Sequence, residues 1–150
     1  MVYGMIERLR LLRALLLVVM ILGLGVGCTD TEELTPEKAD ALTQRVEARW
    51  QALVARDFRA AYEFETPNYR SVFTPAMYEK RFSYGVEWEL TGVDIIHYDA
   101  RAAVASVVAR VMSRSTKPTS AASKALGALP VRFREKWLLI DGEWWHSVKS

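Results

Sequence analysis

Apolar residues recur at helical spacing in the stretch that follows residue 35. Thr35 before Pro36 is a typical helix start, because threonine caps free amide groups and proline fits the first helical position. Four apolar residues then follow at spacings of four, four and three, as on one face of a helix: Leu42, Val46, Trp50 and Leu53. Asp57 and Thr74 predict the caps of two further short helices, the first of which ends before Pro67.

From residue 86 onward the pattern changes to that of β-strands. Alternating or β-branched stretches predict the strands at residues 86–90 continued by 93–98, at 102–112, at 131–140 and at 143–148. Gly92 interrupts the first of them and marks a bulge or bend. Asp141-Gly142 between the last two is a strong hairpin signal. Helices followed by a meander of strands predict an α+β fold, with N-terminal helices packed on one face of a curved antiparallel sheet.

The first 27 residues have the pattern of a cleaved signal peptide rather than of a folded element. Arg8, Arg10 and Arg13 precede an apolar run at residues 14–24, and small residues follow at 25–27. The run is too short to favour a membrane span.

Cys28 follows these small residues directly and resembles the lipobox cysteine of bacterial lipoproteins, which is acylated with fatty acids such as palmitate and becomes the new N-terminus. The resemblance implies attachment to a membrane through Cys28, on its periplasmic side, with residues 28–35 as a polar tether. Thr29 is not the aspartate that favours retention in the inner membrane, so the resemblance implies the outer membrane.

Charge and cysteine content support a cut at this point. The whole chain has 20 basic and 18 acidic residues, but from Cys28 onward there are 17 of each. A neutral chain gives no compositional support for nucleic-acid binding. Cys28 is the only cysteine, so the domain at residues 36–150 has no internal disulfide, and two histidines are too few for a structural zinc site. We expect no metal or other cofactor. The small-residue stretch 115–130 predicts a mobile loop.

Two segments resemble the nuclear-transport-factor-2-like superfamily of cone-shaped α+β domains. Residues 49–70 contain a helix, a break at Asp57, an aromatic pair and the spacing Pro67 to Tyr69; Trp137 and residues 141–144 resemble the last hairpin of that fold. The resemblance covers roughly residues 36–150 and implies a sheet and helices that enclose a pocket. Some members of the superfamily are isomerases, dehydratases or cyclases, and many others only bind or assemble.

The last hairpin predicts one candidate catalytic pair. A two-residue turn places Ile140 opposite Glu143, and the register then puts Glu135 and His146 within reach of each other on an otherwise apolar face. Such a pair would suit proton transfer in an aromatic pocket. The competing interpretation, which we favour, is that Glu135 is buried and paired with His146 or an arginine for structural reasons.

Other side chains offer weaker candidates. Aromatic residues could line a pocket but are more typical of a core: Trp50, Tyr62, Trp88, Trp137 and Trp144. Leu138 and Trp145 are predicted on the outer face of the sheet, where an exposed aromatic suggests a contact surface. Asp94 and His97 lie three apart on a strand and are predicted on opposite faces.

We therefore expect a lipid-anchored periplasmic binding or assembly module of the cell envelope, without catalysis. Its partners are the membrane, through Cys28, and a protein partner or a second copy of the chain; a small-molecule ligand is left open. Two alternatives stay open: a small isomerase or hydratase-type enzyme that uses Glu135 and His146, and a structural lipoprotein that dimerises through the outer sheet face. An open interior lined by this pair would favour the enzyme, whereas a filled core would favour the others.

Overall fold

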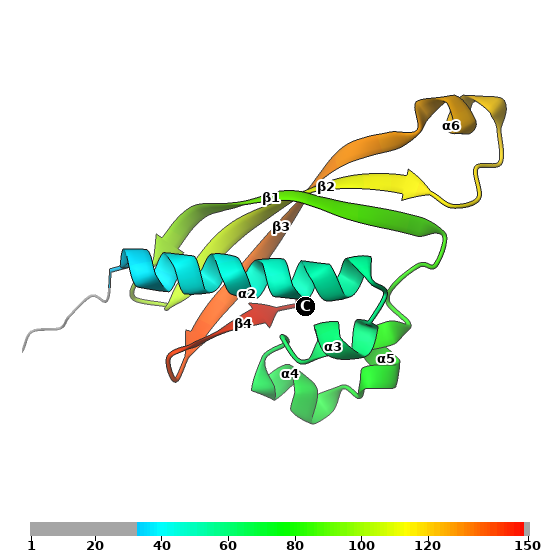
Figure 1. Cartoon of the computed structure of the whole chain (residues 1–150). Helices are drawn as coiled ribbons and strands as arrows, with labels where there is room; N and C mark the ends of the chain where they lie inside the picture. The colour runs from blue at the N-terminus through cyan, green and yellow to red at the C-terminus, as the bar shows by residue number, and fades with distance from the viewer. Residues whose placement is uncertain (1–32, 149–150) are drawn as a thin grey trace, which may run out of the picture. The chain divides into compact units, whose positions relative to one another are not determined.

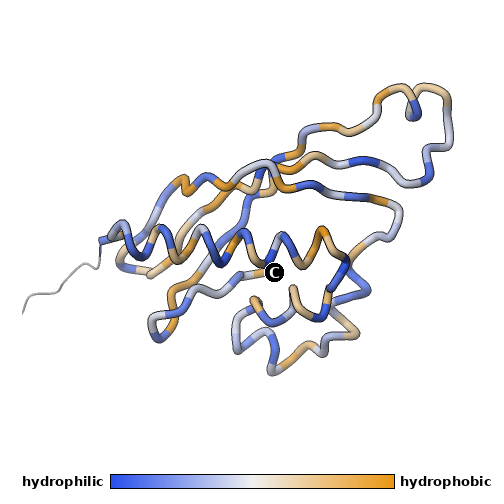
Figure 2. Tube along the Cα trace, viewed as in Figure 1, coloured by the Kyte–Doolittle hydropathy of each residue, from blue (hydrophilic) through white to orange (hydrophobic). Residues whose placement is uncertain are grey.

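Helix α2 (Pro36–Val54) begins and buries the face that the sequence predicts. The computed structural model describes residues 33–148, so the predicted leader and Cys28 lie outside the described residues. The Thr35 hydroxyl accepts a hydrogen bond from the amide of Lys38, with Pro36 in the first turn. The predicted stripe is confirmed: Leu42, Val46, Trp50 and Leu53 are all buried. Hydrophilic and hydrophobic positions recur along α2 in Figure 2. Among the described residues no helix is long and apolar enough to cross a membrane.

Three short helices follow α2. Asp57 caps α3 (Phe58–Tyr62) and Thr74 caps α5 (Pro75–Glu79), as predicted. Between them lies α4 (Pro67–Val72), which the sequence analysis missed. The reason is that Thr66 and Pro67, interpreted as the end of one helix, also form the cap and first residue of the next.

The strands form one antiparallel sheet in the order β1-β2-β3-β4: β1 (Val86–Asp99), β2 (Val104–Ser115), β3 (Ala128–Ile140) and β4 (Glu143–Ser147). The α+β class with an antiparallel sheet is therefore confirmed. A bulge occurs at Gly92, as predicted, and a second one occurs between Ile95 and His97. Asp141 and Gly142 have φ angles of 51° and 82°, which suits a two-residue hairpin turn. The predicted register from Ile140 opposite Glu143 to Lys136 opposite Ser147 is confirmed.

The segment at 115–130 differs from the predicted loop. It contains helix α6 (Ala121–Leu126), and β3 begins at Ala128 rather than at Val131. The outer ends of β2 and β3 pair with each other up to Arg114 and Ala128, so this end of the hairpin projects past the C-terminal end of α2 (Figure 1). Hydrophobic periodicity could not detect α6, because its small residues do not form an apolar face.

The core lies between α2, the short helices and the inner face of the sheet. It contains alternate residues of β2, together with aromatic rings from the helices and the sheet: Trp50, Phe58, Tyr62, Tyr78, Trp137 and Trp144. All core residues lie between Leu42 and Trp144. The chain from residue 36 onward therefore carries a hydrophobic core of its own.

Candidate functional site: a buried polar cluster

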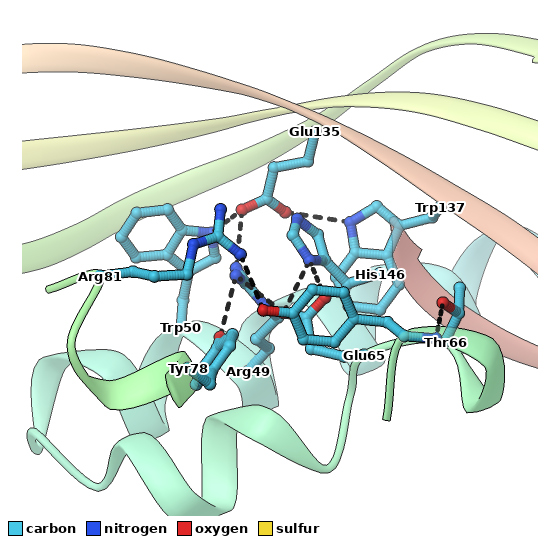
Figure 3. Close-up of polar contacts among 10 residues, drawn as sticks. Arg49, Trp50, Glu65, Thr66, Tyr78, Arg81, Glu135, Trp137 and His146 are labelled. Atoms are coloured by element: carbon cyan, nitrogen blue, oxygen red, sulfur yellow. Dashed lines mark hydrogen bonds and ion pairs between the residues drawn. The ribbon is translucent and has the colours of Figure 1, made fainter. Parts of the chain in front are cut away.

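Five polar side chains meet inside this core, although their surroundings are apolar. Arg49 comes from α2, Glu65 from the segment after α3, Tyr78 from α5, Glu135 from β3 and His146 from β4 (Figure 3). Their exposed fractions lie between 0 % for Glu65 and 9 % for His146. A buried charge is tolerated only when it is paired, so the contacts among these groups decide whether the core is stable.

Arg49 is the hub of this cluster. Its Nη1 donates to Oε1 of Glu135 at 2.9 Å, and its Nη2 lies 3.5 Å from Oε1 of Glu65 and 3.3 Å from the hydroxyl of Tyr78. The carboxylate of Glu135 also accepts hydrogen bonds from two indole groups, those of Trp50 and Trp137, each at 3.0 Å. Both oxygens of Glu135 therefore accept hydrogen bonds from surrounding donors. This is the arrangement that an ionised carboxylate requires.

Glu65 and His146 form the second half of the cluster. Nδ1 of His146 lies 2.9 and 2.8 Å from the two oxygens of Glu65, so this nitrogen carries the hydrogen when Glu65 is ionised. The backbone holds the two residues together: His146 donates its amide to Phe64 O at 2.7 Å, and its carbonyl accepts from Thr66 at 3.2 Å. The segment around Glu65 therefore pairs with the outer edge of β4 and covers it.

The formal charges of the cluster do not cancel. Two carboxylates and one guanidinium leave one negative charge, which a proton on His146 would balance. Burial acts to lower the pKa of Arg49, but attraction from Glu135, the Tyr78 oxygen and Glu65 outweighs it and raises that pKa above its ordinary value. Burial, with a smaller contribution from the charge of Glu65, raises the pKa of Tyr78 far above its ordinary value, against the opposing effect of Arg49. Tyr78 is therefore a neutral phenol, whose oxygen accepts from Nη2 of Arg49.

The burial of this cluster limits which acid–base reactions its side chains could catalyse. A general acid or base must reach a proton of its substrate within hydrogen-bond distance. Here each carboxylate and Nδ1 of the imidazole already face partners within the protein, and the most exposed residue of the five is only 9 % accessible. The cluster therefore joins the helices to the sheet, and little of its surface is accessible to a bound molecule.

The predicted candidates Glu135 and His146 both lie in this cluster, yet no described hydrogen bond joins them. Glu135 is paired with Arg49, and His146 with Glu65. The sequence analysis missed Arg49, Glu65 and Tyr78. Arg49 gave a usable signal, because it lies three residues after Val46 and one turn before Leu53, on the buried side of the helix. Glu65 gave none, since its position depends on the contact with β4.

The predicted pocket residues belong mostly to the core. Trp50, Tyr62, Trp137 and Trp144 are between 0 % and 6 % exposed. Trp88 is half-buried against them, and lines a hollow of about 330 Å³ at the surface together with Arg56, Glu87, Glu89 and Arg114. Trp144 borders another hollow of about 290 Å³, beside the start of α2.

The predicted outer-face pair of Leu138 and Trp145 is less exposed than expected. Trp145 pairs with Leu138 as predicted, but both are only partly accessible. The guanidinium groups of Arg45 and Arg70 lie 5.2 and 5.1 Å from the centre of the Trp145 ring. Cation–π contacts therefore cover part of the Trp145 ring, and the rest of it stays accessible.

Asp94 and His97 do not point to opposite faces. They lie opposite Val108 and Ser106, which are two residues apart on β2 and so share a face. The second bulge absorbs one residue and restores the alternation. Asp94 is paired with Arg110 at 3.2 Å rather than with His97. Among residues 33–148 no three His, Cys, Asp or Glu side chains are grouped so as to hold a metal ion.

Comparisons with known proteins add little. No protein-family model and no curated protein matches the chain. Among solved structures, it is similar to a SEC-C motif-containing protein from Rhodopseudomonas palustris, at 16 % identity and a TM-score of 0.45, over 69 % of this chain and 73 % of the other. A likeness of that size carries no argument about fold family or function.

Proposed function

We propose that this chain is a lipid-anchored periplasmic module that binds or assembles in the cell envelope, without catalysis. The observation that carries the proposal is the closure of the polar cluster. The side chains suited to proton transfer, Glu135 and His146, are used in internal pairs with Arg49 and Glu65. Because these side chains are used inside the core, we expect partners to bind at the surface of the domain.

The anchor rests on the sequence pattern around Cys28, which lies in the same chain but outside the described residues. The polar stretch after it ends where α2 begins at Pro36, so a tether would lead directly into the folded domain. We further propose that this domain belongs to the nuclear-transport-factor-2-like superfamily and that its sheet is curved. Helices followed by an antiparallel meander support that assignment.

Metabolic labelling with a fatty-acid analogue tests the anchor. We expect label on the wild-type chain, and an unlabelled, unprocessed precursor for Cys28→Ser, because the thiol is the acylated group. Fractionation is expected to place the labelled protein in the outer membrane. Equal label on wild type and variant would contradict the anchor, and recovery only in inner-membrane fractions would contradict the location.

Recovery of partners from solubilised envelope tests the role of the domain. The matched control is residues 1–35 fused to an unrelated folded domain, which shares the leader, Cys28 and the tether. We expect a partner that is enriched with the natural chain and missing from the control. The same set of proteins from both would contradict a binding role for residues 36–150.

A further inference from the structure

The neutral composition conceals a strong separation of charge. The β2–β3 hairpin, residues 104–140, contains one acidic residue, Glu135, and seven basic ones: Arg110, Arg114, Lys117, Lys124, Arg132, Arg134 and Lys136. The remaining described residues, 33–103 and 141–148, contain nine basic and fourteen acidic ones. We call residues 104–140 the basic hairpin. Its single carboxylate is buried against Arg49, so it does not reduce the positive charge at the surface.

Most of these cations have no anionic partner within the described chain. Arg110 pairs with Asp94 and Arg114 with Glu87, and half or more of each arginine side chain is still exposed. The others form no ion pair with described residues. On β3 the exposed cations occupy every second position, 132, 134 and 136, so they project from the outer face at intervals of about 7 Å.

One feature of this face opposes stability. Arg110 and Arg132 lie directly opposite each other on neighbouring strands. Like charges in that position repel, which destabilises a sheet. Asp94 offsets part of this repulsion through its pair with Arg110, and an anion bound beside Arg132 would remove the rest. Arg134 and Lys136 also flank a hollow of about 160 Å³, which is lined by Ile96 and Val108 as well.

The far end of the basic hairpin adds an apolar component. Leu126 at the end of α6 is 61 % exposed, and Leu129 near the start of β3 is 47 % exposed. Lys117 and Lys124 lie in the same connection, which has no acidic residue. This end projects from the rest of the domain (Figure 1). Exposed leucines next to lysines are typical of segments that enter the boundary between lipid headgroups and acyl chains.

We infer that the basic hairpin docks on an anionic lipid surface, with the end at Leu126 and Leu129 dipping into the interface and the cations of β3 contacting headgroup phosphates. A dissolved polyanion would satisfy the cations but would gain nothing from the leucines. The inference deepens the proposed function, since an anchor at Cys28 would hold the domain close to such a surface.

Vesicle binding by the unlipidated chain tests the inference independently of the anchor. The protein is residues 28–150 with Cys28→Ser, which retains the whole core. Co-sedimentation is measured with vesicles of mixed phosphatidylglycerol and phosphatidylcholine and with vesicles of phosphatidylcholine alone. We expect binding to the anionic vesicles only, weakened by added salt.

Two double variants with the same change in net charge localise the site. Arg132→Gln with Arg134→Gln should weaken binding to anionic vesicles more than tenfold, at about fivefold for each cation removed. Arg59→Gln with Lys80→Gln, on α3 and at the end of α5, should leave it unchanged, because both residues lie on the helical part of the domain. Equal losses in both variants would show a nonspecific charge effect and overturn the inference.

A third variant separates a lipid surface from other occupants. Leu126→Ser with Leu129→Ser should weaken vesicle binding while leaving any binding to dextran sulfate unchanged. If this variant binds vesicles as wild type does, the occupant is not a lipid surface. A wild-type dimer in sedimentation equilibrium that Arg132→Gln with Arg134→Gln dissociates would assign the face to a second copy instead. A negative vesicle result with normal fatty-acid labelling at Cys28 would leave the anchored module standing and remove only the membrane contact.

Discussion

Replacing Arg49 by methionine is expected to bring the domain close to unfolding. Methionine fills similar space on α2 but removes the guanidinium that contacts Glu135, Glu65 and Tyr78. Two carboxylates with almost no access to solvent would then remain without their main cation. This uncompensated negative charge, rather than lost packing, is the source of the effect.

Removal of one partner from a buried ion pair destabilises a protein by about 3–5 kcal/mol. Two indole donors still hold Glu135, and His146 still faces Glu65, so we expect the lower part of that range. A small domain has about 5–15 kcal/mol of total stability. At roughly 4 °C for each kcal/mol in a domain of this size, the melting temperature should fall by more than about 10 °C.

Thermal and urea unfolding of residues 28–150 with Cys28→Ser, followed by circular dichroism, measures the effect. Arg59→Met is the matched control, because Arg59 is exposed on α3 and should change stability by less than about 0.5 kcal/mol. Replacing Glu135 by leucine together with Arg49→Met should recover part of the loss, since no unpaired carboxylate then remains at β3.

Glu135→Gln is expected to be more harmful than its similar size suggests. Oε1 of Glu135 accepts from Arg49 and Trp50, and Oε2 accepts from Trp137. A glutamine amide would direct its own N–H groups at one of these donors and leave the amide and that donor unsatisfied, at about 1–3 kcal/mol.

The Arg49 prediction has a clear refuting result. If the free energy of unfolding of Arg49→Met lies within about 1 kcal/mol of wild type, the cluster is not buried in solution and the reasoning fails.

Three further predictions test the packing around this cluster. Trp50→Ala should destabilise the domain by about 3–5 kcal/mol, because a large buried ring leaves a cavity, and an unchanged melt would place Trp50 at the surface. The raised pKa of Tyr78 gives stability that is complete below about pH 10 and declines as the pH rises above that unfolded value. Unfolding titrations from pH 8 to 11 should show a steeper decline in wild type than in Tyr78→Phe, and equal slopes would contradict the assignment to Tyr78. Gly92→Ala should cost less than about 1 kcal/mol: its Cβ would clash with the guanidinium of Arg110, but that end of the side chain is flexible and can move away, losing only the exposed pair with Asp94. A larger loss of stability in urea unfolding would show that the neighbours of Gly92 cannot adapt.

Local patterns in the sequence were sufficient for most elements of this fold. Capping residues such as Thr35 and Asp57 act within one turn, and the stripe from Leu42 to Leu53 depends only on helical spacing. The turn at Asp141 and Gly142 sets the whole register of β3 and β4. Each of these features is decided by residues that lie close together in the chain, so one sequence suffices to find them.

The missed features depend on contacts between distant residues. Glu65 enters the core because the segment around it pairs with His146, 81 residues later in the chain. The second bulge in β1 follows from its pairing with β2, and it reverses the predicted relation of Asp94 to His97. Neither contact has a signature in the local pattern. The candidate site could therefore be predicted only for Glu135 and His146, the two members that a hairpin register places.

The buried cluster and the basic hairpin are connected through the alternation of β3. Glu135 points inward to Arg49 while Arg134 and Lys136, its neighbours on either side, lie exposed on the outer face. A shift of β3 by one residue would exchange the two faces, placing cations in the core and the carboxylate outside. The bonds from Arg49 and Trp50 on α2 oppose such a shift, because an inward cation at this position would meet an indole donor and a guanidinium. The polar core is thus more than a source of stability: it selects the register that presents the cations of β3 to solvent.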